Sequence, residues 1–306
     1  MPVDGPSARR YKEVMGADLI DLAGAIYAHA YGIVNAMLLR LWNPAVVFFC
    51  YAVLEFALPR GGRRNSWRSY ARGLRFFAAA VIVNTLIFTV VTPLIDVGQI
   101  KPLAVIDLRP LTESSFLPLR VLGWFGAGFL ILIIGNVIYY WMHRAQHQVP
   151  VLWRFHKVHH SIREMSATTS YHHFTEDLLQ YVVVIVPMAF LLGVESGPVP
   201  WIFLAIARTQ HLFIHSSTAI DIGPLRFIIG ENRFHRIHHS LEARHFGKNF
   251  GTATPLWDVL FGTAYFPRAG EWPEVGLSRV PEPQTVAEYL MMPLRPVDPA
   301  MAVGRA

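Results

Sequence analysis

The sequence predicts an all-α protein, a multi-pass transmembrane helical bundle with a cytosolic helical cap. Apolar residues make up 53% of the 306 residues and charged residues only 16%, whereas soluble domains carry about a quarter charged residues. This deficit of charge indicates a surface that faces lipid. In addition, thirteen of the fourteen histidines lie between His143 and His245, which concentrates this residue type in one stretch of the chain.

Apolar runs that could become spanning helices follow one another along the chain. About 20 apolar residues are needed to cross the hydrocarbon of a bilayer, and the runs at 73–95 and 119–142 meet this need best. The other runs lie at 19–41, 44–59, 179–194 and 198–215. Asp21 and His29 dilute the first of these, and Pro187 interrupts the third. We expect four firm spans and up to six.

The orientation of the bundle follows from the arginines. Six of them lie between Arg60 and Arg75 in one short connection, and such loops stay in the cytoplasm. Alternating from there, all histidine clusters come to lie on the cytoplasmic side. We therefore expect an integral multi-pass membrane protein, in the inner membrane if the source is bacterial. These loops explain the net charge of +6, so nucleic acid is not an expected partner. The N-terminal residues lack the compact apolar stretch of a secretory signal, so no removed presequence is expected.

The chain is expected to form a single integral-membrane unit over residues 1–306. Beyond about residue 266 it becomes richer in proline and charge, so 266–306 is predicted to be a peripheral C-terminal tail. The single cysteine, Cys50, lies in an apolar run. One cysteine excludes an intrachain disulfide, a thiolate zinc site and a cysteine-held iron–sulfur cluster.

Ten histidines stand at spacings that place them on shared helix faces, because positions three and four apart lie one turn from each other. They form four clusters, which are His143 and His147; His156, His159 and His160; His211 and His215; and His235, His238 and His239. Such faces are suited to hold a cation. For His211 and His215, polar packing near the membrane interface is the alternative.

The number of imidazoles favours two metal ions over one. Neutral imidazole ligates iron, zinc, copper or nickel. A structural zinc is saturated by four ligands, and a catalytic zinc by three plus water. Ten ligands therefore suit two ions at about five each, with a position on each left open for oxygen or water. We interpret the clusters as a dinuclear redox centre.

Competing catalytic signatures are missing from the sequence. It contains no His-Glu-x-x-His zinc-protease helix, and Gly123, Gly126 and Gly128 lie inside an apolar run instead of following a strand. They are therefore no dinucleotide fingerprint. Reducing equivalents are expected from another protein.

Three motifs and an ending resemble the fatty acid hydroxylase and sterol desaturase superfamily of integral-membrane di-iron oxygenases. The motifs are His143-Arg-Ala-Gln-His147, His156-Lys-Val-His159-His160-Ser161 and His235-Arg-Ile-His238-His239-Ser240, and the ending is Asn249-Phe250-Gly251 with Trp257-Asp258. The resemblance covers roughly residues 125–265, the expected catalytic region. It implies that the ten histidines are the metal ligands, and that they come from membrane-helix ends and short cytosolic helices.

Further polar residues near these motifs are candidates for orienting the ligands or lining the substrate path. They are His172, His173, Glu176, His245, Asn249 and Asp258. The three histidines could equally be ordinary interfacial residues. The two carboxylates could accept hydrogen bonds from ligand imidazoles, which would fix the tautomers of the rings. For Asp258 a helix cap is an equal alternative.

The resemblance implies an O₂-dependent di-iron monooxygenase that hydroxylates or desaturates an unactivated C–H bond of a membrane lipid, such as a fatty acyl chain or a sterol. Its cofactors would be two iron ions and O₂, with electrons from a ferredoxin or cytochrome b5-type donor and its reductase. The alternatives are a metal-dependent membrane hydrolase and a zinc or nickel transporter. A hydrolase needs a general-base carboxylate beside the metal, and a transporter needs ligands at mid-membrane depth.

Overall fold

The computed structural model describes residues 45–60, 64–95, 100–194 and 198–295, together with Gly32 and Val34. Apart from Gly32 and Val34, the apolar run at 19–41 lies outside the described residues, and so does His29. After a helix at Ala45–Ala57, the elements are α2 (Trp67–Leu94), β1 (Ile106–Asp107), η3 (Arg109–Thr112), α3 (Leu117–Gln148), α4 (Pro150–His160), η4 (Ala167–Thr169), α5 (Phe174–Gln180), η5 (Tyr181–Ile185), α6 (Val186–Leu191), β2 (Leu192–Gly193), α7 (Pro198–His215), η6 (Gly223–Phe227), α8 (Asn232–His238), η7 (Ala243–His245), α9 (Leu256–Leu260), α10 (Val286–Met291) and η8 (Met292–Leu294).

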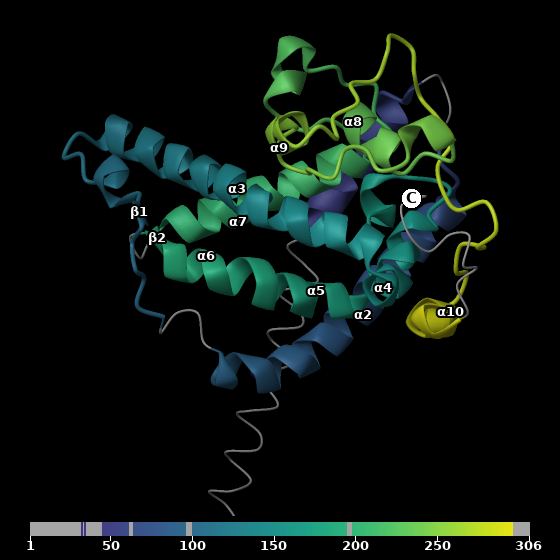
Figure 1. Ribbon diagram of the computed structural model, residues 1–306, viewed down its shortest axis with the longest axis horizontal. Helices are drawn as coiled ribbons and strands as arrows, with labels where there is room; N and C mark the ends of the chain where they lie inside the picture. The colour runs from purple at the N-terminus through teal and green to yellow at the C-terminus, as the bar shows by residue number, and fades with distance from the viewer. Residues whose placement is uncertain are drawn as a thin grey trace, which may run out of the picture.

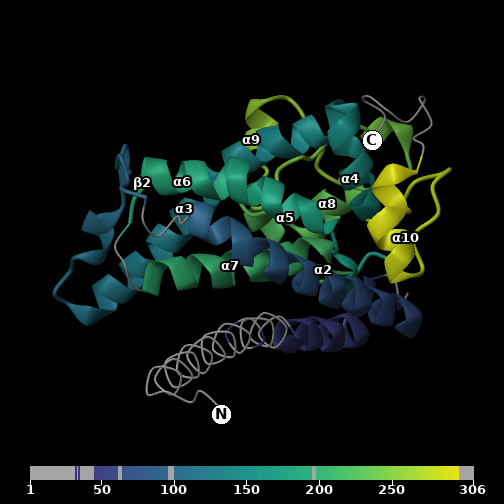
Figure 2. The same ribbon diagram turned by 90° about the horizontal axis from the view of Figure 1, so that it is seen from below.

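The long helices form a bundle, and the short ones gather at one of its ends (Figure 1). Helix α3 packs along α7, and α2 packs against α5 (Figure 2). The bundle core joins α3 to α6 and α7 through apolar side chains, among them Ile131, Met188 and Val199. Helices α4, α8 and α10 lie on the other side of the molecule from the β1–β2 pair, and α9 lies beside α3 (Figure 1). The bundle therefore has an apolar half and a half built of short elements.

Three segments are long and apolar enough to cross a membrane within the described part of the chain: Trp67–Leu94, Leu117–Gln148 and Phe174–Leu191. The helix at Ala45–Ala57 is apolar but shorter. The run predicted at 198–215 does form a helix, α7, yet it is not among these segments, because Arg208, Gln210 and two histidines dilute it. The described residues thus supply three such spans, where the sequence predicted four firm ones in the whole chain.

The segment Phe174–Leu191 is continuous in spite of Pro187. A proline inside a helix lacks the N–H of the usual hydrogen bond and crowds the preceding turn. Here the chain widens into a π-helix at Tyr181–Ile185, and the backbone N–H of Val186 bonds to the carbonyl of Tyr181. Such π-bulges absorb an irregularity without ending a helix.

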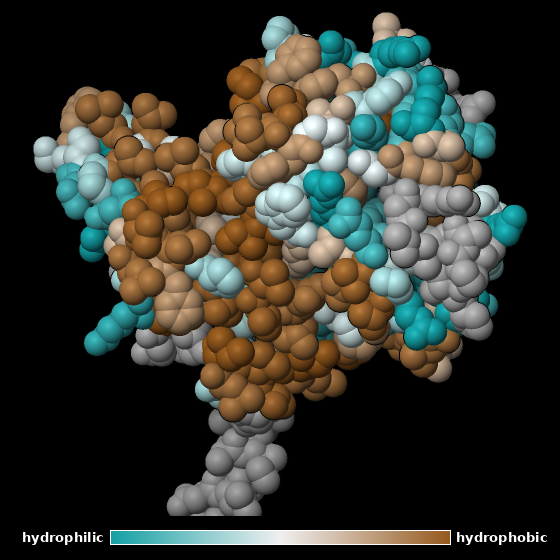
Figure 3. Space-filling view, viewed as in Figure 1, coloured by the Kyte–Doolittle hydropathy of each residue, from teal (hydrophilic) through white to brown (hydrophobic). Residues whose placement is uncertain are grey.

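The surface divides in the same way as the fold. In the view of Figure 3, apolar residues cover the bundle, while polar residues concentrate on the end formed by the short helices. Along α2 and α3, large apolar side chains such as Leu86, Val90, Leu122 and Phe125 are exposed. A continuous exposed apolar surface of this kind is suited to lipid. The chain is a membrane helical bundle, as predicted.

A two-residue parallel ladder is the departure from purely helical structure. Ile106 pairs with Leu192, and Asp107 pairs with Gly193. The ladder ties the loop before α3 to the end of α6, and it lies at the opposite end of α3 and α7 from their histidines (Figure 1). It satisfies backbone groups at this end of the bundle and plays no part in the site.

The segment predicted as a peripheral tail packs into the protein over part of its length. Tyr289 and Met292 are buried, and the ring of Tyr289 stacks on that of Phe76 in α2 at a centroid distance of 4.9 Å. A buried ion pair of 2.8 Å joins Arg72 to Glu282. Residues 282–292 are therefore part of the core, because their apolar side chains cover the junction of α2 and α4.

Candidate metal centre

A proline turn brings the first two histidine clusters together. Helix α3 ends at Gln148, Val149 is extended, and Pro150 begins α4. Proline fits the first turn of a helix and disfavours a helical residue before it. The chain therefore folds back directly after His147, and the last turns of α3 lie beside the last turns of α4. Helices α7 and α8 bring the remaining histidines to the same place.

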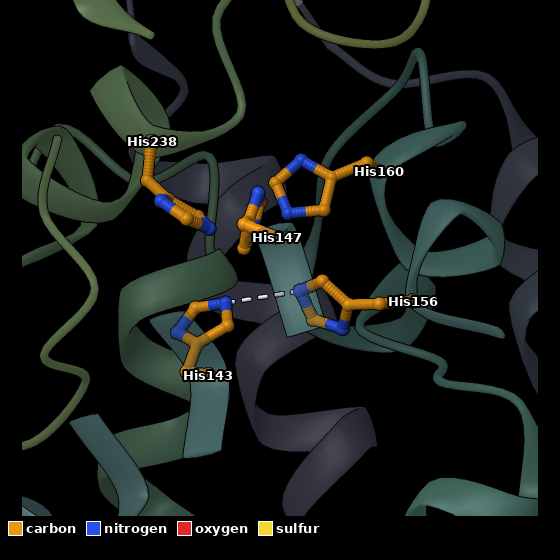
Figure 4. A group of neighbouring side chains, drawn as sticks. All are labelled: His143, His147, His156, His160 and His238. Carbon is orange, nitrogen blue, oxygen red and sulfur yellow. Dashed lines mark hydrogen bonds between the residues drawn. The ribbon is translucent and has the colours of Figure 1, made fainter. Parts of the chain in front are cut away.

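Nine of the ten predicted ligands gather in two groups. The first group holds His143, His147, His156, His160 and His238, and the second holds His159, His215, His235 and His239. All nine are buried, and within each group one ring nitrogen per residue lies within 4.8 Å of the others. Figure 4 shows the rings of the first group around a common centre. The two groups alternate along α4, since His159 and His160 belong to different groups.

The tenth predicted ligand, His211, lies outside both groups. It stands one helical turn before His215, and its backbone carbonyl accepts a 2.7 Å hydrogen bond from Nδ1 of that residue. Its ring lies 5.7 Å from the ring of His172. The i, i+4 step brought the two α7 histidines to one helix face as predicted, but a helix that slants past the centre presents only its last turn to it.

Backbone carbonyls fix the orientation of four rings. Nδ1–H donates to a carbonyl oxygen in His143 (Phe250, 2.7 Å), His159 (Tyr171, 3.0 Å), His215 (His211, 2.7 Å) and His238 (Lys248, 2.8 Å). A carbonyl oxygen can only accept, so the proton of each neutral ring is on Nδ1. Nε2 then carries a lone pair that points into the centre.

A carboxylate fixes the orientation of the His156 ring. Its Nδ1 donates to Oε2 of Glu176 at 2.8 Å, and the same oxygen accepts from Nε2 of Gln146 at 2.7 Å. The expectation that Glu176 bonds to a ligand imidazole agrees with this geometry. Sequence reasoning missed Gln146, which is buried and one residue before His147. Its position between His143 and His147 on the same helix is the sequence feature that could have identified it.

Lone pairs face each other across the centre. Nε2 of His143 lies 2.9 Å from Nε2 of His156, and Nε2 of His159 lies 3.1 Å from Nε2 of His215. Each of these four rings already donates through Nδ1, so neither contact contains a proton while the rings are neutral. Desolvation lowers the pKa of His156 to about 3, which keeps this ring neutral. Facing lone pairs repel unless a cation lies between them.

Other ring nitrogens of the two groups are buried without a partner. Among the described residues, no hydrogen bond reaches Nε2 of His147, His160 or His238, or Nδ1 of His235 or His239. Leaving buried polar atoms unpaired is costly. Imidazole nitrogens held in this way fit transition-metal ions such as iron, zinc, copper or nickel, and two groups of five and four fit two ions.

His172 extends the second group. Its ring stacks on that of His159 at a centroid distance of 3.7 Å, and it also lies within 4.8 Å of His156 and Glu176 in a third cluster of possible ligand atoms. The sequence left its role open between ligand positioning and an ordinary interfacial position. The stacking places it directly against a ring of the centre.

Asp258 and Asn249 hold the loop behind the first group. Asp258 accepts from the backbone N–H groups of Phe250 and Gly251, each at 2.7 Å. It touches no imidazole and is not the N-cap of α9, which is Pro255, so neither predicted role is observed. Asn249 has φ 61° and bonds to the carbonyls of Phe234 and Tyr265. Together they aim the Phe250 carbonyl at His143.

A side chain on Gly251 would not fit this loop. A Cβ there would lie 2.5 Å from the carbonyl oxygen of Thr254 and 2.7 Å from Oδ2 of Asp258. The Asn-Phe-Gly element of the sequence thus shapes the backbone of this loop, because the glycine leaves space for the carboxylate of Asp258.

His173 and His245 serve other parts of the structure. His173 caps α5 and bonds to Thr175 at 2.8 Å. His245 bonds to Ser240 at 2.8 Å and approaches Glu271 at 3.3 Å. Neither belongs to a group of ligand atoms among the described residues, so the structure does not bring these two candidates to the centre.

Aromatic rings close the centre from outside. Trp153 is buried, and its ring lies 5.2 Å from that of His147 and 5.5 Å from that of His160. Phe250 lies 5.3 Å from His147 on another side. The sequence analysis did not single out Trp153, although it shares a face of α4 with His156 and His160 by its spacing. These rings keep water away from the first group.

The comparisons with known proteins agree with this site. The fatty acid hydroxylase family model matches residues 128–263. The chain is 32% identical over 148 residues to the ornithine lipid hydroxylase OlsE of Rhizobium tropici, covering 48% of this chain and 44% of that protein. It is 28% identical over 140 residues to the alkylglycerol monooxygenase of Homo sapiens, covering 46% and 30%. For the fatty acid hydroxylase vlmA of a Lecanicillium species the identity is 31%, covering 43% and 40%.

These matches span less than half the length of each relative, and no solved structure matches the chain. The matched residues 128–263 contain both histidine groups and the loop at Asn249–Gly251. Over these residues the chain is similar to the fatty acid hydroxylase family, as the histidine motifs predict.

Proposed function

We propose that this protein is an O₂-dependent di-iron enzyme that hydroxylates an unactivated C–H bond of a membrane lipid. Nine buried imidazoles in two adjacent groups are the proposed ligands. Support comes from the family of the domain and from relatives that are named as lipid hydroxylases and monooxygenases. Desaturation of the same lipid position would use the same centre.

The observation that carries the proposal is the pair of short Nε2–Nε2 contacts, His143 with His156 and His159 with His215. Each group contains one such contact between two rings that both donate through Nδ1. Since the Nδ1 atoms of all four rings donate elsewhere, each contact calls for a cation, and two contacts in two groups call for two cations. A single-ion site would leave one contact as bare repulsion.

When bound, two iron ions would supply the capacity to reduce O₂ and oxidise a C–H bond. The chain's own residues provide the rest. Backbone carbonyls and Glu176 hold the rings in the tautomer with Nε2 free and raise the basicity of that atom. Trp153 and Phe250 exclude water from the first group, which protects a reactive site from side reactions.

The substrate and the partners follow from the surroundings of the centre. The histidines lie in the last turns of α3 and α7 and on the short helices α4 and α8, so a lipid in contact with the apolar bundle can approach them. We propose that this polar end faces the cytoplasm, because the arginines from Arg60 to Arg75 favour that side. A ferredoxin or cytochrome b5-type donor with its reductase would then deliver electrons there.

A hydrolase fits these contacts less well. Metal-assisted hydrolysis needs a carboxylate facing the metal-bound water. Among the described residues, the carboxylate next to the rings is Glu176, and it lies on the Nδ1 side of His156, turned away from the facing Nε2 atoms. A transporter would need ligands along the spans, whereas these gather at one end of the bundle.

Metal analysis and lipid analysis test the proposal together. Purified protein is expected to contain about two irons per chain and to consume O₂ when a reductant and membrane lipid are supplied. Lipid extracts of a deletion strain should lack a species that is heavier than its precursor by one oxygen atom. One zinc per chain without O₂ consumption would contradict the proposal.

A further inference from the structure

Two opposite charges stand on separate helices beside the centre. Asp177 is in the first turn of α5, directly after Glu176, and Arg208 is in α7, seven residues before His215. Both side chains are exposed. They form no ion pair with each other within 4.0 Å, although each charge acts electrostatically on the other.

Arg208 has few protein partners. Its guanidinium lies 5.6 Å from the ring centroid of Phe77 in α2. None of the described residues accepts a hydrogen bond from it or pairs with it, so the five N–H donors of the group are free on this part of the chain. A cation resting on an aromatic face while its donors point elsewhere is arranged to receive an anion.

The carboxylate of Asp177 is held by one hydrogen bond, and its other oxygen has no donor in the described part of the chain. Nδ2 of Asn84, a buried residue of α2, donates to its Oδ2. Within the described part of the chain, Oδ1 of Asp177 accepts no hydrogen bond. Asn84 thus fixes the carboxylate in place and leaves one oxygen for a donor from outside the protein.

The surroundings make these charges costly without a ligand. On the same helices, Trp201, Leu204 and Val182 are exposed, so the surface around the two charges is one that faces lipid. Ionised side chains at such a place are expensive and mark functional sites. A ligand that carries both signs would neutralise both residues at once, whereas an ion of one sign would leave the other unpaired.

We propose that Asp177 and Arg208 form a binding site for the headgroup of a zwitterionic lipid, with its ammonium group at Asp177 and its phosphate or carboxylate at Arg208. This inference rests on the proposed function, because it names the class of lipid that the enzyme takes. Seven helical residues separate Arg208 from His215, a rise of about 10 Å, and Asp177 adjoins the residue that holds His156. The oxidised carbon is therefore close to the headgroup and not at the far end of an acyl chain.

Charge-selective binding tests the site without any turnover. Three dioctanoyl lipids serve as probes: phosphatidylethanolamine, phosphatidic acid and diacylglycerol. Binding is measured on the full-length protein in detergent, both iron-loaded and metal-free. Arg208→Gln should weaken the binding of phosphatidylethanolamine and of phosphatidic acid by about tenfold or more, which is the effect of losing one charge-assisted hydrogen bond. Asp177→Asn should weaken the binding of phosphatidylethanolamine alone, and neither substitution should change the affinity for diacylglycerol.

The matched control is Arg75→Gln, which removes an exposed arginine of α2 outside the pair. It should leave all three affinities unchanged. Equal binding of the three lipids by the wild-type protein, or equal losses for all three in either variant, would overturn the headgroup site.

The position of the new hydroxyl group, read from fragment masses of the oxidised lipid, is an independent check. A hydroxyl at the chain terminus would also overturn the inference while leaving the proposed oxidation intact. Conversely, charge-selective binding by a protein that oxidises no lipid would retain the headgroup site and remove the proposed function.

Discussion

The two histidine groups are built from the same residue type but are supported differently. Three of the five rings in the first group donate through Nδ1 to an acceptor, one of them to the carboxylate of Glu176. In the second group two of four rings do so. Among the described residues, buried Nδ1 atoms without a partner occur in both groups, in His147 of the first and in His235 and His239 of the second. The first group therefore differs from the second by a ring that a carboxylate orients and by one additional imidazole, and the second has more room for other ligands.

The largest effect is expected from removing one imidazole in each group. His156→Ala and His215→Ala should each lower lipid oxidation by more than about a hundredfold, since a metal ligand matters at least as much as the groups that orient it. Each variant should retain about one iron per chain, measured by mass spectrometry of the metal.

His245→Ala is the matched control for these two variants, because His245 is also buried but lies outside both groups. It should retain both irons. If either ligand variant kept two irons and full oxidation, the assignment of that group would be wrong.

Glu176→Gln sharpens the difference in support. The amide keeps the size of the carboxylate but loses the charge that orients the His156 ring and raises its basicity. We expect iron affinity at the first group to fall by about 10- to 100-fold, with little change at the second. Titration of metal-free protein with Fe²⁺, followed by the two binding steps, measures this. Equal weakening of both steps would argue against separate groups.

Metal removal should also distinguish the groups. Because the second group has fewer imidazoles and, in the described part of the chain, no ring that donates to a carboxylate, its ion is expected to leave first under a chelator. An intermediate with about one iron per chain should therefore accumulate. Its Mössbauer spectrum should match that of His215→Ala. Simultaneous loss of both ions would break the comparison.

The smallest expected effect concerns the support of the second group from the C-terminal segment. The hydroxyl of Tyr289 donates to the backbone carbonyl of His172 at 2.7 Å, and His172 stacks on His159. Tyr289→Phe keeps the buried ring and removes this bond, at a cost of about 1 kcal/mol of folding stability. Thermal unfolding should show a small decrease in Tm, with the first group's metal affinity unchanged. A decrease in the metal affinity of the first group alone would contradict the proposal that Tyr289 supports the second group through His172.

Much of the site was accessible from spacing. Steps of three and four residues identify helix faces, and nine of the ten histidines chosen in this way do meet in space. His211 could not be separated from His215 by sequence, because both lie on one face of α7 and the slant of that helix decides which of them reaches the centre. The same limit applies to Asp258, whose carboxylate contacts a backbone loop that has no periodic signature.

Local chemistry along the chain was sufficient to determine an apolar helical bundle with a histidine-rich end, because hydropathy and helical period are properties of short segments. Tertiary structure alone decided which nine of the ten rings form the two groups, which Nδ1 atoms find an acceptor, and how Asp177 comes to lie near Arg208. These depend on crossing helices and on carbonyls contributed by distant loops, and no segment carries that information by itself.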